Sequence, residues 1–273
     1  MADNRPIGIF DSGLGGLTVM REIVKQLPNE DIVYFGDTGR IPYGSKSEDT
    51  IKTYAKQDEA FLLSCNVKAI IAACGTVSAV ASSTGKNLPV PFFEVISHAV
   101  KAAVDSTKNK RIGIIGTEAT IQSGAHKKQI LSLMPDALVF SQSCPLFVPL
   151  VEEGWTSADN TIVLETAHKY LDSFLLNGID TLILGCTHYP ILIDVIKKVL
   201  GNDVQLINMG KATALQVKKA LAEKGALSDS ANCGTHKYYV SDMTSSFEKT
   251  AKILLNEKIN SNNAKQVNIL AVK

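Results

Sequence analysis

The sequence predicts an α/β fold made of two pseudo-symmetric domains, each a mainly parallel sheet flanked by helices, with the active site in the cleft between them. Three observations predict it. Short apolar runs alternate with amphipathic stretches, this pattern restarts near the middle of the chain, and in each half one apolar run ends in a cysteine. Continuous apolar strands separated by helices are typical of a parallel sheet covered on both faces.

Strands are expected where short runs of β-branched and aromatic residues occur, and helices where the apolar residues recur at helical spacing. In the first half the expected strands are 7–10, 32–35, 69–73 and 91–95, with helices at 17–26, 48–63 and 76–83. After the restart the strands are 112–115, 137–140, 181–184 and 204–207, with helices at 121–133, 161–175 and 191–200. A tail with a helix at 212–223, a strand at 237–240 and a helix at 245–255 is expected to pack back on the first half.

The restart is a pseudo-repeat, because "IGIFDSG" at Ile7 and "IGIIGTE" at Ile112 each open a half. The polar, lysine-rich segment 97–110 is expected to link the two domains. We therefore divide the chain into a first domain of residues 1–97 plus 211–273 and a second domain of residues 98–210.

Composition excludes several classes of protein. The formal net charge of +1 gives no electrostatic footprint for nucleic acid. The first residues lack the features of a signal peptide, and no apolar run is long enough for a membrane span, so a cytoplasmic location is expected. Five cysteines without a Cys-x-x-Cys pair argue against a disulfide scaffold and against a zinc site, so no metal is expected.

The two cysteines that follow apolar runs, Cys74 and Cys186, are the principal candidates for chemistry. A free cysteine is more often a packed core residue, but the repeat would bring these two to the carboxyl ends of corresponding strands, where α/β sheets bind ligands. Two acid/base groups on opposite sides of one carbon can invert its configuration. Helix N-termini beyond both cysteines are expected to lower the thiol pKa from about 8.5 toward neutrality.

Two loops that follow strands are further candidates for binding. The glycine-rich turn 11–16 could hold an anion such as a carboxylate on its free N–H groups. It lacks the Lys-Ser/Thr of a P-loop, and Thr18 stands where a dinucleotide fingerprint has its third glycine. The loop 37–44, with its Pro-Tyr-Gly, occupies a similar position after the next strand.

Polar side chains near the second cysteine complete the candidate site. His188 lies in the same short loop as Cys186, where it could orient or protonate a bound amino acid. Glu152 and Glu153 follow an apolar run, which favours a position near the site over an ordinary pair of surface acids.

The stretches "PIGIFDSGLGGLTV", "GDTGRIPYG", "CPLFVPLVEEG" and "LILGCTHYPIL" resemble the glutamate racemases of the aspartate/glutamate racemase family. These are cofactor-independent enzymes that make D-glutamate for peptidoglycan. The resemblance runs from Ile7 to the tail "KYYVSDMTSSFEKTAKILL". "GCTHYP" is its most specific element, because aspartate racemases usually lack the His-Tyr pair.

The resemblance implies roles for the matching residues. Cys74 would act on D-glutamate and Cys186 on L-glutamate, assisted by Asp11 and His188, with Glu152 a further polar partner. It also implies a glutamate substrate, no cofactor and a homodimer. The substrate-binding residues that it implies are Asp11, Ser12, Pro42, Tyr43, Gly44, Gly75, Thr76 and Thr187.

Two departures from the family pattern keep other functions open. Gly75 replaces the usual asparagine after the first cysteine, and Ser97-His98-Ala99 replaces a usual Glu-Pro-Gly. The alternatives are a racemase for another amino acid such as aspartate, a non-catalytic amino-acid-binding paralogue weakened at Gly75, and a hydrolase using Cys186 with His188. From the sequence, Gly75→Asn is expected to leave activity equal or higher.

Overall fold

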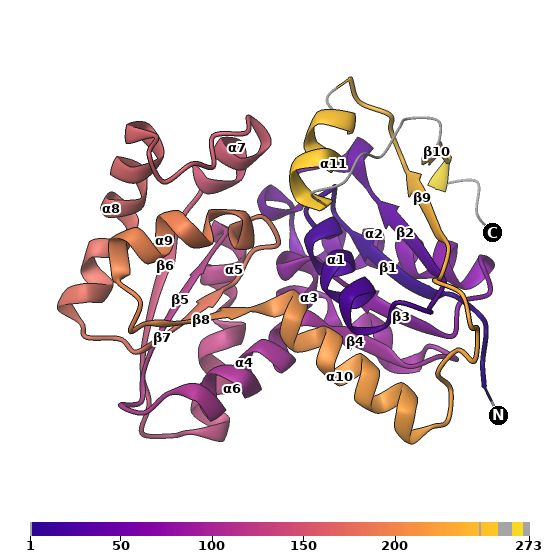
Figure 1. The fold of residues 1–273 in the computed structure, drawn as a ribbon, viewed down its shortest axis with the longest axis horizontal. Coiled ribbons are helices and arrows are strands. Elements are labelled where there is room, and N and C mark those ends of the chain that lie inside the picture. The colour runs from indigo at the N-terminus through magenta and orange to yellow at the C-terminus, as the bar shows by residue number, and fades with distance from the viewer. Residues whose placement is uncertain (1, 246, 256–263, 270–273) are drawn as a thin grey trace.

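The chain forms two lobes, each built on its own parallel sheet (Figure 1). The structure is a computed structural model that describes residues 2–245, 247–255 and 264–269. Helices flank both sheets, so the prediction of an α/β fold with two parallel sheets is confirmed.

The first sheet has the strand order β10-β9-β2-β1-β3-β4, and all its neighbours pair in parallel. The residues of β1, β2 and β3 are all buried, which explains their continuous apolar sequences. β9 pairs with β2, so the tail packs back on the first half as expected. The strands are β1 Ile7–Asp11, β2 Ile32–Gly36, β3 Ala69–Ala72, β4 Phe92–Glu94, β9 His236–Val240 and β10 Ala264–Gln266.

The second sheet has the order β6-β5-β7-β8 and is also parallel. Its strands are β5 Arg111–Gly116, β6 Leu138–Ser143, β7 Thr181–Leu184 and β8 Gln205–Asn208. β5 and β7 are neighbouring interior strands, as β1 and β3 are in the first sheet, and Cys186 follows the buried strand β7 after one glycine.

The helices follow the expected pattern with local differences. The expected helix 121–133 is divided at Gly124, whose φ of +64° ends one helix and begins the next. Ser246, within the expected helix 245–255, lies outside the described residues. The helices are α1 Leu17–Gln26, α2 Glu48–Ser64, α3 Gly75–Val80, α4 Val95–Ser106, α5 Glu118–Ser123, α6 Ala125–Leu133, α7 Phe147–Glu152, α8 Thr161–Leu176, α9 Ile193–Leu200, α10 Met209–Glu223 and α11 Phe247–Leu255.

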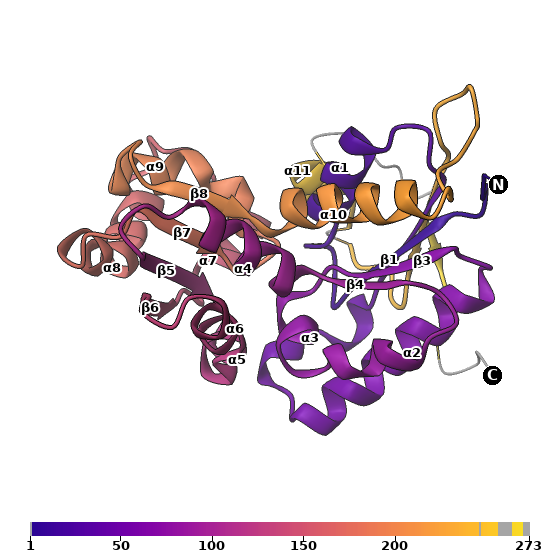
Figure 2. The same cartoon turned by 90° about the horizontal axis from the view of Figure 1, so that it is seen from below.

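The segment 97–110, which was expected to link the two domains, is mostly helical. Most of it belongs to α4, whose N-terminus is capped by the Glu94 carboxylate and which buries Val100 and Ala103. α4 packs against α10, and these two helices join the lobes (Figure 2). The boundaries expected at 97/98 and 210/211 fall in the first turns of these helices, and the exact division stays a prediction.

None of the described helices is both long and apolar enough to cross a bilayer.

Candidate active site

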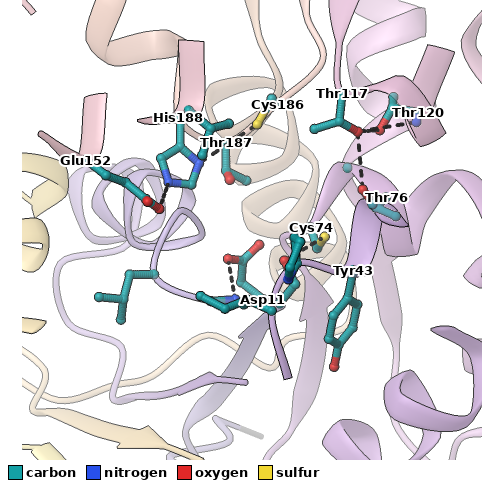
Figure 3. A pocket seen from close by; sticks show the side chains of 18 of the residues that line it. Asp11, Tyr43, Cys74, Thr76, Thr117, Thr120, Glu152, Cys186, Thr187 and His188 are labelled. Carbon is teal, nitrogen blue, oxygen red and sulfur yellow. Dashed lines mark hydrogen bonds and ion pairs between the residues drawn. The ribbon is translucent and has the colours of Figure 1, made fainter. Parts of the chain in front are cut away.

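A cleft of about 570 Å³ receives residues from both lobes and from the C-terminal segment (Figure 3). The structure brings all the expected site residues to this one cleft, although their roles stay predictions. They are Asp11, Ser12, Pro42, Tyr43, Gly44, Cys74, Gly75, Thr76, Glu152, Cys186, Thr187 and His188.

Strand ends account for this convergence. Asp11 ends β1, while Cys74 and Cys186 each come two residues after a buried strand, β3 and β7. Parallel strands point their carboxyl ends to one edge of a sheet, and the two lobes present these edges to the same cleft. The two thiols therefore approach the cleft from opposite lobes.

Cys74 is a buried thiol in a hydroxyl-rich environment. It is the residue at the N-cap position of α3, and its Sγ donates to Oγ of Ser12 over 3.4 Å. Burial and the nearby Asp11 carboxylate raise the pKa of Cys74 to about 12, against the opposing hydrogen bond with Ser12. The expected lowering of this pKa is wrong, because loss of solvation outweighs the field of the single short helix.

Cys186 stands beside a charged histidine. Its Sγ lies 3.9 Å from Nδ1 of His188, whose Nε2 lies 3.1 Å from Oε1 of Glu152. Burial lowers the pKa of His188, but the hydrogen bonds with Cys186 and Glu152 outweigh it and raise that pKa to about 10. His188 is therefore an imidazolium near neutral pH, and its charge stabilises negative charge on the Cys186 sulfur.

Asp11 lies between the two thiol environments (Figure 3). It is 2% exposed, and its Oδ2 accepts the Gly13 N–H over 3.0 Å. Burial raises the pKa of Asp11, while the charge of His188 and backbone N–H groups oppose the rise. A buried carboxyl group at this position can hold a proton or a positively charged ammonium group.

Tyr43 reaches the cleft, but its hydroxyl points away from it (Figure 3). The hydroxyl bonds to Asp37 and lies 3.1 Å from Oδ2 of Asp58, and the Arg40 guanidinium bridges the two carboxylates at 2.6 and 3.1 Å. Asp37 and Asp58 are fully buried. The phenol therefore anchors the loop that carries Pro42 and Gly44, instead of offering its hydroxyl to a ligand.

Gly75 occupies a point of very close contact between the lobes. A Cβ atom at this position would lie 2.6 Å from the carbonyl oxygen of Gly185. No side chain fits there unless the lobes move apart, so the arrangement of the cleft depends on glycine at this position.

Several lining residues were missed by sequence reasoning. Thr117 caps α5, and its Oγ1 lies 3.4 Å from that of Thr76 and 2.9 Å from that of Thr120. A signal existed, since "IGIIGTE" aligns Thr117 with Ser12 of "IGIFDSG". The other missed lining residues are Ser45, Glu118, Pro145, Val148, Pro149, Gly185, Thr244 and Thr250.

Within the described part of the chain, no three His, Cys, Asp or Glu side chains are grouped so that they could hold a metal ion.

This chain is similar to known racemases in both sequence and structure. The sequence model described as Asp/Glu/Hydantoin racemase matches residues 7–217. Glutamate racemase from Geobacter metallireducens is 43% identical over 256 residues, covering 93% of this chain and 94% of the relative. The crystal structure of glutamate racemase from Francisella tularensis in complex with D-glutamate has a TM-score of 0.88, with 39% identity and 98% of each chain covered. Isoform RacE1 from Bacillus anthracis has a TM-score of 0.90, with 37% identity over 97% of this chain and 98% of its own.

Proposed function

Because the chain belongs to the Asp/Glu/Hydantoin racemase family, and is therefore an isomerase, we propose that it interconverts L-glutamate and D-glutamate. The substrate is proposed from the relatives, which are named glutamate racemases, one of them in complex with D-glutamate. The observation that carries the mechanism is the pair of thiols, Cys74 and Cys186, that reach one cleft from opposite lobes.

We propose a two-base reaction at Cα. The Cys186 thiolate removes the α-proton of L-glutamate, and the electron pair of the C–H bond stays on the substrate as a carbanion. The Cys74 thiol then gives its proton to the opposite face of the same carbon. D-glutamate results, Cys186 is left as a thiol, and Cys74 is left as a thiolate. The D-to-L reaction reverses every step.

The electrostatic difference between the two sulfurs supports this assignment. The raised pKa of Cys74 keeps its proton on the sulfur, as the proton donor in the L-to-D direction requires. His188, an imidazolium, lies 3.9 Å from the Cys186 sulfur, where it can stabilise the negative charge that develops on the base in that direction.

Hydroxyl groups and backbone N–H groups are proposed to bind the two carboxylates of the substrate. The turn after Asp11 offers backbone N–H groups, and hydroxyls of Ser12, Thr76, Thr117 and Thr187 line the same cleft. Asp11 is proposed to bind the substrate ammonium group, since it is a buried acid that lines the cleft and interacts electrostatically with both Cys74 and His188.

We also propose that the D-glutamate formed supplies peptidoglycan synthesis and that the reaction takes place in the cytoplasm. All five cysteines are free thiols, and a reducing compartment would keep the two in the cleft in that state.

Incubation of the purified protein with each enantiomer in D₂O, without added cofactor, tests the proposal. Optical rotation should fall to zero from both sides, and the α-position of glutamate should gain deuterium. Retention of optical rotation with both enantiomers would contradict glutamate racemisation. Activity on aspartate in its place would favour the alternative substrate, and binding without exchange would favour a non-catalytic paralogue.

Single cysteine variants test the assignment of the bases. Cys74→Ala and Cys186→Ala should each lower racemisation by at least about 1,000-fold, because the reaction needs both proton transfers. Each variant should still exchange the α-hydrogen of the one enantiomer that its remaining thiol faces. Full activity of Cys74→Ser would instead support the cysteine hydrolase, which needs only Cys186 and His188.

A homodimer is proposed as well. Seven apolar side chains of the second lobe are exposed, and their burial against a second copy of the chain would be favourable. They are Leu133, Leu138, Leu146, Trp155, Ile162, Leu175 and Leu176. Light scattering should give twice the chain mass of 29.4 kDa, and a mass of 29.4 kDa at micromolar concentration would contradict it.

A further inference from the structure

The loop that carries Cys186 is bound by a hydroxyl from the other lobe. Oγ1 of Thr18, in the first turn of α1, lies 2.6 Å from the backbone carbonyl oxygen of Thr187, to which it donates. Thr18 is 2% exposed. Its hydroxyl is also 3.0 Å from the carbonyl of Gly15, so the shorter contact is the one between lobes.

The same loop lies against the glycine turn with no space for a side chain. A Cβ atom on Gly15 would lie 2.6 Å from Cε1 of His188, and still closer to the Thr187 hydroxyl. The Thr18 hydrogen bond therefore stands within a tight contact between the turn that follows β1 and the loop that follows β7.

Within its own lobe the loop is held at both ends. The Gly185 N–H donates to the Ile115 carbonyl over 2.7 Å, and the Tyr189 N–H donates to the Cys186 carbonyl over 3.2 Å. Thr187 lies between these two hydrogen-bonded positions in the sequence, and its neighbours on either side are Cys186 and His188. The hydroxyl of Thr18 is therefore placed to fix the middle of the loop relative to the first lobe.

We propose that Thr18 is a positioning residue, whose hydrogen bond to Thr187 sets the place of Cys186 and His188 relative to Cys74 and Asp11 across the cleft. This inference rests on the proposed two-thiol racemisation. In that reaction both sulfurs must reach opposite faces of one carbon, and displacement of a reacting group by about 1 Å can cost about 100-fold in rate.

Thr18 acts on one of the two proton transfers, and isotope effects can reveal this. L- and D-glutamate have equal free energies in water, so every variant must keep kcat/KM equal in the two directions. A displaced Cys186 raises the barrier for proton transfer at its own face. The isotope effect on kcat/KM should then rise with α-deuterated L-glutamate, whose deuteron Cys186 removes. With α-deuterated D-glutamate it should fall toward the equilibrium isotope effect of deuteron transfer from carbon to the Cys74 sulfur.

The variants are Thr18→Val, which keeps the shape and loses the hydroxyl, and Thr18→Ser, which keeps the hydroxyl. We expect Thr18→Val to lower kcat/KM by about 10-fold or more with the opposed changes in isotope effect. Thr18→Ser should restore kcat/KM to within about 3-fold of the unmodified chain, together with its isotope effects. Thermal unfolding of each variant establishes that it is folded.

Two results would overturn the inference alone. One is a kcat/KM of Thr18→Val equal to that of the unmodified chain. The other is a loss of kcat/KM with both isotope effects unchanged, which indicates a general structural role. Failure of the unmodified chain to racemise either enantiomer would overturn the proposed function, and this inference with it.

Discussion

At the scale of single residues, the two thiols differ in what surrounds them. The Cys74 thiol donates to a serine hydroxyl beside a buried carboxylate, whereas Cys186 faces an imidazolium that a glutamate supports. The residues that follow strands were predictable, because parallel strands end at one edge. The direction of the Tyr43 hydroxyl was not, because it depends on Asp58, a residue of α2 that is distant in sequence.

Glu152→Gln tests whether the Glu152 carboxylate stabilises the protonated form of His188. The hydrogen bond and the charge of Glu152 help to raise the pKa of His188 to about 10. Loss of activity at high pH, as His188 loses its proton, should therefore move to lower pH in the variant. We expect a shift of about one pH unit in kcat/KM, since the Glu152 side chain is 43% exposed and partly screened.

Glu153→Gln is the matched control. The neighbouring carboxylate is exposed and lies 2.9 Å from Nζ of Lys249 in α11, away from His188. Its pH profile should follow that of the unmodified chain. An equal shift in both variants would contradict the assignment of Glu152 to His188.

At the scale of helices and strands, sequence patterns predicted those with strong periodicity and missed those with mixed composition. α4 contains lysine, histidine and serine, so its buried face was not recognised. α7 is a short helix of six residues that contains Pro149, and it was not predicted from the sequence. The position of α11 over the cleft, which brings Thr250 into the lining, depends on packing between lobes that no local pattern encodes.

At Gly75, the first residue of α3, the structure leads to a prediction opposite to the one drawn from the sequence. A side chain at position 75 would collide with the Gly185 carbonyl. We therefore expect Gly75→Asn to lower kcat/KM by about 10-fold or more, and Gly75→Ala to lower it less, in an assay of glutamate racemisation. Activity of Gly75→Asn equal to or above that of the unmodified chain would show that the lobes adjust without cost.

The stability of the protein at acidic pH should depend on His126, a buried residue of α6. His126 is 2% exposed, and neither ring nitrogen has a hydrogen-bond partner among the described residues. Burial lowers its pKa from 6.5 to about 4. Between these pH values the unfolded chain binds more protons than the folded chain, so the free energy of unfolding falls as pH falls, by about 3 kcal/mol from this residue.

His126→Leu should remove this part of the acid sensitivity in urea unfolding at pH 7 and pH 4.5. His168→Gln is a suitable control, because the His168 side chain is 42% exposed and paired with Asp172 over 2.9 Å. If His126→Leu and the unmodified chain lose equal stability between these pH values, the buried imidazole is not the cause.

At the scale of the whole molecule, the lobes enclose the reactive thiols while leaving others outside the cleft. Cys74 and Cys186 are 5% and 7% exposed, Cys144 is fully buried, and Cys233 is exposed. Two parallel sheets were predictable from the alternation of strands and helices, but how closely they approach was not. That distance depends on glycines whose importance appears only when both lobes are in place.

Alkylation with iodoacetamide, followed by peptide mass spectrometry, reports on this enclosure. Cys233 should react first, and Cys186 should react before Cys74, because the raised pKa of Cys74 keeps its thiol protonated. D-glutamate should slow the reaction at both cleft thiols and leave Cys233 unaffected. Equal protection of all three thiols, or none, would contradict a glutamate site between the lobes.

In the proposed cycle, the protonation of the two sulfurs after a turnover depends on which enantiomer was released. Each turnover leaves the stored proton on the other sulfur, so a protein that has just released one enantiomer is ready to take that same enantiomer back. Exchange with water must return the proton before another molecule of the original hand can react. The raised pKa of Cys74 favours the return of a proton to that sulfur, so the protein keeps a one-proton record of having released D-glutamate only until water supplies that proton.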